Sequence, residues 1–402
     1  MKFRIKFFII VLLFLAGALV VYHFSKQSSI FSVEFENKVQ NDPGLEKIIS
    51  TQLNGKKGTF AIFIEELEAT SAGQTPEVNS VNTKTSGVEG EVLPGQTSPA
   101  GQTPEVKSVN TKTSGVELRK YALNENEFFP SASLYKLILL ASVMKEIEAS
   151  RLKLEDTITG SKTDLTNRLG SLDFGYEDMP ENLEFSVKEI LERIGRISDN
   201  FASIMLTDKL RSLDKLSVIP ARFDEASARR AKAGIQENKN WIPGHGSASL
   251  TTGARDDNGD DPLVQMAKEL GMENTSFDLA DIGPTTTASD IALYFRKLYK
   301  GEIVSKVVSD KIIGILALNQ INDRIPAKLP ENVNVIHKTG ELALIRHDAG
   351  LVFPNLPNSP NHPYLIILLS KDLEFEDDGV ETLANISKGV WDYFNKGGPA
   401  GN

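Results

Sequence analysis

The sequence predicts a mixed α/β fold of the α+β type, with an antiparallel five-stranded sheet flanked by helices beside an all-helical domain. Strand-like runs lie near both ends of the chain and helical patterns lie between them, which favours one sheet with an inserted helical domain. The 402 residues are 40% hydrophobic and 24% charged, as in globular proteins. The five predicted strands are residues 58–64, 118–123, 333–338, 347–353 and 364–370.

Helical patterns account for much of the remaining chain. We predict helices at residues 43–53, from Ser133 to about Asp208, and at 263–270, 288–300 and 380–395. Thr287-x-x-Asp290 is a capping pattern that would open the helix at 288–300. The last helix is amphipathic, with one apolar face made of Leu383, Ile386, Val390 and Tyr393.

The first 26 residues have the pattern of a signal anchor. Three basic side chains precede an uninterrupted apolar run over residues 7–22. The run is short for a membrane-spanning helix of about 20 residues and long for the apolar core of a signal peptide. We favour an uncleaved anchor with its basic end in the cytoplasm and residues 27–402 outside the membrane. If the segment is cleaved, the domain is secreted.

A low-complexity insertion is predicted at residues 69–115. It is rich in Ser, Thr, Gly and Pro, and it contains a direct repeat in which residues 101–117 differ from residues 73–89 at one position. Such a segment cannot bury a core, so we expect a disordered loop at the tip of a hairpin. A solvated linker is the preferred interpretation, and a flexible wall-associated tether is the alternative.

A second, charged insertion is predicted at residues 217–261. It ends in an acidic run at 256–261, which raises the question of a calcium loop. The run lacks the glutamate that such loops place at their twelfth position, so a solvated turn is the better interpretation.

Charge and composition exclude several kinds of partner. A net charge of -10 argues against nucleic-acid binding by the folded part. The absence of cysteine excludes disulfides, thiolate metal sites, a cysteine nucleophile and a lipoprotein anchor. With only five histidines, a multi-histidine metal site is not expected. We therefore predict no metal site and no cofactor.

Ser133-Leu134-Tyr135-Lys136 is the first of three short motifs that carry chemistry. S-x-x-K occurs four times, but only here does Pro130 precede it and a buried helix follow. Residues three apart share a helix face, so Lys136 is expected beside the Ser133 hydroxyl, where it could act as a general base. Taken alone, Ser133 could equally be a helix N-cap.

Ser198-Asp199-Asn200 and Lys338-Thr339-Gly340 each occur once. The first opens an apolar helix, where helix capping is the alternative interpretation. The second is expected to end a strand, where a lysine and a hydroxyl suit a substrate carboxylate. Gly340 would let a substrate backbone lie against the strand edge. The alternative interpretations of each motif taken alone do not explain why all three motifs occur in this order.

The three motifs in this order resemble those of class A β-lactamases and penicillin-binding proteins, a group of active-site-serine hydrolases. The resemblance covers roughly residues 42–396 outside the insertions and implies the β-lactamase/transpeptidase-like fold. It extends to Phe129–Ser133 and to Arg346–Val352. It implies the following roles: Ser133 forms an acyl-enzyme, Lys136 activates it, Ser198 and Lys338 transfer protons, Asn200 binds the substrate amide, Thr339, Gly340 and Lys338 bind substrate, and the backbone amides of Ser133 and Glu341 form the oxyanion hole.

The departure from the family concerns deacylation. Class A β-lactamases carry a glutamate on an Ω-loop in a pattern like E-x-x-L-N, and here the corresponding interval spans only residues 273–284. Asp281 and Glu225 are candidate substitutes in poor context. We therefore predict an anchored enzyme acylated by β-lactams or peptidoglycan stem peptides, with slow β-lactam hydrolysis. The alternatives are a D-alanyl-D-alanine carboxypeptidase or transpeptidase, and a non-catalytic penicillin-binding or wall-binding protein.

Overall fold

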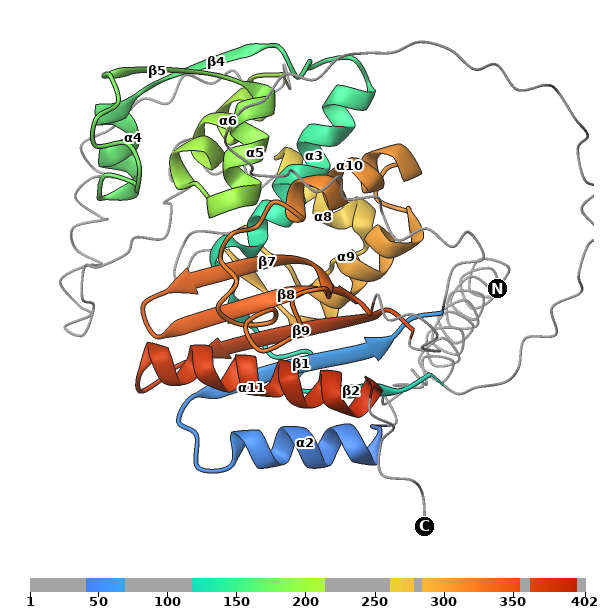
Figure 1. Ribbon diagram of the computed structural model, residues 1–402. Coiled ribbons are helices and arrows are strands. Elements are labelled where there is room, and N and C mark those ends of the chain that lie inside the picture. Colours follow the sequence, from blue (N-terminus) through green and yellow to red (C-terminus); the bar gives the residue numbers. More distant parts are fainter. Residues whose placement is uncertain (1–40, 69–117, 214–260, 278–283, 355–361, 396–402) are drawn as a thin grey trace, which may run out of the picture. The chain divides into compact units, whose positions relative to one another are not determined.

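The five predicted strands form one antiparallel sheet, in the order β2-β1-β9-β8-β7 (Figure 1). The computed structural model describes residues 41–68, 118–213, 261–277, 284–354 and 362–395, all of them in one compact unit. The strands are β1 (Thr59–Glu66), β2 (Lys120–Leu123), β7 (Asn334–Leu342), β8 (Ile345–Phe353) and β9 (Tyr364–Lys371). All five strand predictions are confirmed, and β7 is an edge strand.

Helices cover both faces of the sheet, which explains why its central strands are apolar on both sides. Helices α2 (Pro43–Leu53) and α11 (Glu376–Asn395) pack together on one face, and α9 (Ala288–Lys300) contacts β1, β8 and β9 (Figure 1). Leu383, Ile386 and Val390 are buried against the sheet as predicted. Thr287 caps α9 by accepting a hydrogen bond from the Asp290 amide, so the predicted cap is confirmed.

The helical region surrounds α3 (Lys136–Glu148), which is buried over its first nine residues. Helices α6 (Asn200–Leu213), α8 (Pro262–Leu270) and α10 (Lys306–Leu316) pack against it, and α4 (Lys162–Leu169) and α5 (Val187–Ile197) pack against α6. The helical prediction between Ser133 and Asp208 missed an antiparallel pair of strands, β4 (Thr157–Ser161) and β5 (Asn182–Ser186). Each of these strands buries one apolar side chain, which leaves too little alternation to detect. Helix α10 was also not predicted.

Short elements join the sheet to the helical region. Strand β3 (Phe129–Pro130) pairs with β6 (Thr285–Thr286), and the 3-10 helix η1 (Ala132–Tyr135) leads directly into α3. The η1 residues lie against β7, so this junction brings the first motif to the sheet edge.

Three predictions lie outside the described residues: the anchor at 1–26, the insertion at 69–115, and all but the last residue of the insertion at 217–261. The strands on either side of the first insertion do pair as a hairpin. Among the helices within the described ranges, none has the length and apolarity needed to cross a bilayer.

Candidate active site

Ser133 lies on η1 and lines a cavity of about 500 Å³. The residue before it, Ala132, has a left-handed φ of 46°, which is costly for a residue with a side chain. The approach to this turn is held by a 2.7 Å hydrogen bond from the Ser131 amide to the Pro284 carbonyl. Such strained backbone persists only where the surrounding structure holds it in place.

Lys136 is the first residue of α3, and its side chain is fully buried. Its amine donates to Asn200 Oδ1 at 2.8 Å, to Ser198 Oγ at 3.3 Å and to the Ser198 carbonyl. Burial lowers the pKa of Lys136 to about 8, while the carboxylates of Asp173 and Asp199 oppose that change. The amine makes no hydrogen bond to Ser133; the sequence-based expectation placed it beside that hydroxyl, and the structure turns it toward Ser198.

Ser198 lies between α5 and α6 in a left-handed conformation, with φ at 58°. This turn directs its hydroxyl toward both lysines, and Lys338 Nζ donates to it at 2.7 Å. Asp199 lies buried beneath the turn, where it accepts from Tyr176 Oη, Arg193 Nε and the Ala202 amide. These contacts brace the turn, and Asp199 rather than Ser198 caps α6.

Asn200 is held on both sides of its amide group. Its Oδ1 accepts from Lys136, and its Nδ2 donates to Asp173 Oδ1 at 3.3 Å. Asp173 also accepts from the Asn200 backbone amide at 2.7 Å, so it helps to cap α6. No motif pointed to Asp173, because it lies in a loop 27 residues before Asn200 and meets it only in the folded chain.

Lys338, Thr339 and Gly340 lie within β7, which continues to Leu342. The expectation that they end a strand is wrong, because the β7–β8 pairing extends as far as Leu342 and Ile345. The Lys338 amine is buried, and burial together with Lys136 lowers its pKa well below the usual range. Thr339 is 1% exposed, and its Oγ1 has no hydrogen-bond partner within the described part of the chain.

Gly340 allows η1 to lie close against β7. A Cβ added at this position would lie 3.2 Å from Ala132 Cβ and 3.2 Å from His347 Cδ2. These contacts are tighter than ordinary van der Waals contact, so a larger residue would displace the turn that carries Ser133. Close packing of η1 against β7 is therefore a second reason for glycine at position 340, in addition to the predicted room for a substrate backbone.

Two buried side chains behind the site were not predicted as site residues. Arg324 is 1% exposed and donates to Glu341 Oε1 at 2.5 Å. Burial raises the pKa of Glu341, but the Arg324 guanidinium holds that pKa below its usual range. His347 is fully buried; its Nε2 donates to the Pro130 carbonyl at 2.8 Å, and its Nδ1 accepts from the Ser370 amide. Burial lowers the pKa of His347 to about 4, so the ring is neutral at neutral pH.

Four carboxylates line the cavity, those of Asp173, Glu177, Glu341 and Glu376. Glu341 pairs with Arg324, Glu376 pairs with Arg346, and Asp173 accepts hydrogen bonds from α6. The segment expected to carry a deacylating glutamate is closed by two 2.9 Å backbone hydrogen bonds between Ser276 and Thr285. The candidate substitutes Asp281 and Glu225 lie outside the described residues.

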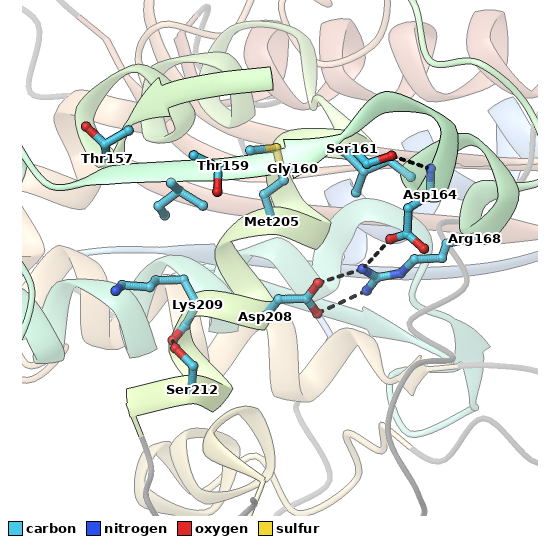
Figure 2. Close-up of a pocket in the computed structure, with 12 residues that line it drawn as sticks. Thr157, Thr159, Gly160, Ser161, Asp164, Arg168, Met205, Asp208, Lys209 and Ser212 are labelled. Atoms are coloured by element: carbon cyan, nitrogen blue, oxygen red, sulfur yellow. Dashed lines mark hydrogen bonds and ion pairs between the residues drawn. The ribbon is translucent and has the colours of Figure 1, made fainter. Parts of the chain in front are cut away.

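A second cavity, of about 360 Å³, lies between β4, α4 and α6 (Figure 2). The guanidinium of Arg168 faces both carboxylate oxygens of Asp208 there and also Asp164. These charges pair with one another, which is consistent with a structural role. Across the described ranges, no group of three His, Asp or Glu side chains is arranged to hold a metal ion.

The comparisons with known proteins agree with this fold. The model of the beta-lactamase enzyme family matches residues 100–394, whereas a search of curated protein sequences gave no match. Among solved structures, a β-lactamase from Sphaerobacter thermophilus is 16% identical with a TM-score of 0.55, over 87% of this chain and 97% of that one. A mutant of PBP-A, solved as an acyl-enzyme complex with penicillin G, is 19% identical with a TM-score of 0.56, over 87% and 96%. A class A β-lactamase from Bacteroides cellulosilyticus is 17% identical with a TM-score of 0.55, over 88% and 98%. These likenesses show a shared fold, and because the family match spans most of the sequence, the chain belongs to the beta-lactamase enzyme family of serine hydrolases.

Proposed function

We propose that this hydrolase uses Ser133 as its nucleophile and that β-lactams or D-alanyl-D-alanine peptides acylate it. The observation that carries the proposal is the convergence of two buried amines on one hydroxyl. Lys136 and Lys338 both donate to Ser198 Oγ, on elements that also line the cavity with Ser133. Burying two amines side by side is costly for folding, which favours a chemical role for them.

Acylation can be written with these groups alone. Ser133 Oγ attacks the carbonyl carbon, and its proton passes to the neutral amine of Lys136, whose pKa burial has lowered to about 8. The Ser198 hydroxyl then gives a proton to the departing nitrogen and regains one from the lysines that donate to it. The backbone amides of Ser133 and Glu341 are proposed to stabilise the negative oxygen, because η1 lies against edge strand β7.

The substrate carboxylate is proposed to bind at Lys338 and Thr339. Thr339 Oγ1 is buried and has no partner within the described ranges, so a ligand oxygen there would satisfy it. Asn200 keeps one Nδ2 hydrogen for the substrate amide, because its Oδ1 and its other Nδ2 hydrogen are engaged by Lys136 and Asp173.

Slow deacylation is part of the proposal. Hydrolysis of an acyl-serine needs a base that activates water. The carboxylates described along the cavity are paired with arginine, engaged in capping α6 or, for Glu177, exposed to solvent. The protein should therefore accumulate as an acyl-enzyme.

Labelling with fluorescent penicillin tests the nucleophile. Wild type should take up one covalent label, and Ser133→Ala should take up none. Ser150→Ala is the matched control, since Ser150 and Lys153 repeat the S-x-x-K spacing at an exposed site and the variant should label normally. If wild type takes up no label, the protein is a non-catalytic binding protein and the proposal fails.

A D-alanyl-D-alanine carboxypeptidase or transpeptidase is the second candidate. Its support is the same absence of a described deacylating base, together with the likeness to PBP-A. Release of D-alanine from a stem peptide, compared with turnover of nitrocefin, separates the two activities. Sustained nitrocefin hydrolysis would contradict slow deacylation.

We also propose that residues 1–26 anchor the domain at the outer face of the cell membrane. The basic flank and the apolar run support this location. In fractionated cells the full chain should sediment with membranes, and a chain that starts at residue 27 should not. A full-length chain found only in the soluble fraction would overturn the anchor.

A further inference from the structure

One wall of the active-site cavity carries two carboxylates that form no ion pair with the described residues. Asp173 and Glu177 both line the cavity from the loop after α4. Within the ranges that the structure describes, neither forms an ion pair, whereas Glu341 and Glu376 on the opposite wall pair with Arg324 and Arg346. Asp173 accepts hydrogen bonds from α6 and acts on Lys136 through Asn200, whereas Glu177 has no such partner in the described part of the chain. The carboxylates without an ion pair are therefore confined to the wall formed by residues 171–177, which we call the loop wall.

The loop wall also exposes an aromatic ring. Phe174 is 79% exposed and Leu172 is 42% exposed, although both are large apolar side chains that line the cavity. Phe174 lies next in sequence to Asp173 and three residues before Glu177. An aromatic face with carboxylates nearby is the arrangement that attracts an ammonium group.

The opposite wall independently points to a ligand with an anionic end. Thr339 is 1% exposed, lines the same cavity and leaves its hydroxyl without a partner among the described residues. The buried amine of Lys338 precedes it on β7. A ligand that satisfies Thr339 with a carboxylate would extend its other end past Asn200 toward the loop wall.

We infer that the site prefers acyl donors that carry an ammonium group on the acyl side, opposite the carboxylate. An α-aminoacyl β-lactam and a stem peptide with a free side-chain amine share this chemistry. The ammonium would lie at Phe174 between the carboxylates of Asp173 and Glu177. The inference rests on the proposed acylation of Ser133 and adds the class of substrate that acylates it fastest.

Three penicillins provide a matched set of probes, because they differ only at the α carbon of the side chain. Benzylpenicillin carries hydrogen there, ampicillin an ammonium and carbenicillin a carboxylate. Second-order acylation rate constants should be measured at about pH 6, where an α-amine is protonated. Ampicillin should acylate fastest and carbenicillin slowest, with about two- to fivefold between successive probes, the size expected of an exposed ion pair. The differences should shrink in high salt.

Variants locate the preference on the loop wall. Glu177→Gln should lower the ratio of ampicillin to benzylpenicillin, and Phe174→Leu should lower it while keeping an apolar contact. Glu184→Gln removes the same charge from an exposed position that does not line the cavity, so its ratio should equal that of wild type. Thermal melting of each variant checks that the fold is intact.

A peptide pair tests the second source of the ammonium group. Nα-acetyl-lysyl-D-alanyl-D-alanine should acylate the enzyme faster than the same peptide acetylated on its side-chain amine. Equal rates for the three penicillins in wild type, or unchanged ratios in both loop-wall variants, would overturn the inference. If no penicillin labels wild type at Ser133, it is the proposed function that fails.

Discussion

Asp173→Asn should make acylation less dependent on high pH. The Asp173 carboxylate raises the pKa of Lys136 against the effect of burial. Removing its charge should therefore lower that pKa below about 8, so that more of the amine is neutral in mildly acidic solution. Asparagine still offers an oxygen to the Asn200 amide, so the start of α6 should keep its cap.

The size of the change in the Lys136 pKa follows from the distance between the Lys136 ammonium and the Asp173 carboxylate. Lys136 Nζ lies 2.8 Å from Asn200 Oδ1, and Asn200 Nδ2 lies 3.3 Å from Asp173 Oδ1. With the amide between them, the charges are about 7 Å apart. Coulomb's law then gives about 0.6 kcal/mol at the dielectric of water and about 2.4 kcal/mol at an effective dielectric of 20. At about 1.4 kcal/mol per unit, the pKa should fall by about 0.4 to 1.7 units.

The assay is the rate of acylation by fluorescent penicillin at saturating concentration, followed from about pH 5 to pH 10. The rising limb of this profile reports the two coupled lysines together, so its midpoint is the quantity to compare. The Asp173→Asn midpoint should lie below that of wild type, and the two rates should converge above about pH 9. Glu184→Gln, which removes a charge away from the cavity, should leave the midpoint unchanged.

A midpoint that rises in Asp173→Asn, or does not move while the variant melts like wild type, would refute the reasoning. It would mean that Lys136 is not the group whose deprotonation limits acylation. Lys338 would then be the next candidate, since its pKa is also lowered by burial and by Lys136.

Substitutions at three positions separate chemical from structural roles. Lys136→Met should abolish labelling yet raise the melting temperature at pH 7, since a pKa lowered from 10.5 to about 8 marks a folding penalty of up to about 3 kcal/mol. That penalty is present below pH 8 and disappears as the pH rises toward 10.5, so the gain in melting temperature should disappear with it. Thr339→Val should melt at or above the wild-type temperature but acylate about 10- to 100-fold more slowly, as for a lost hydrogen bond to a charged group; Thr339→Ser should acylate normally, and equal rates for Val would exclude a carboxylate contact. His347→Gln keeps a donor for the Pro130 carbonyl and should acylate normally, whereas His347→Asn keeps only an acceptor for Ser370 and should acylate about tenfold more slowly at a temperature where both variants are folded. Equal acylation rates in the two His347 variants would count against a positioning role.

The sheet was predictable because its strands are apolar runs bounded by turn residues, and each predicted run forms a strand of the sheet. The β4–β5 pair was not predictable, because each strand buries one apolar side chain and α4 separates the two strands in sequence. The end of β7 was misplaced because a K-T-G triplet looks like a turn, although the pairing with β8 continues beyond it.

The candidate site likewise contains residues that the sequence identified and residues that it did not. Short motifs identified Ser133, Lys136, Ser198 and Lys338, because their spacing is local and their chemistry is specific to a family. Asp173 and His347 act on the site through backbone groups of α6 and β3. Residues that act through contacts between distant segments have no spacing to recognise, so they emerge only when the chain is folded.

Several unfavourable features lie around Ser133, and together they argue against a non-catalytic binding protein. Ala132 and Ser198 hold left-handed conformations, with φ at 46° and 58°. Lys136 and Lys338 are buried amines with lowered pKa values, and the buried Thr339 hydroxyl has no partner in the described part of the chain. Each of these costs folding free energy. A site without a function has no selection against substitutions that relieve such costs, so strain, buried amines and an unsatisfied hydroxyl kept at one cavity favour a working acyl-transfer centre.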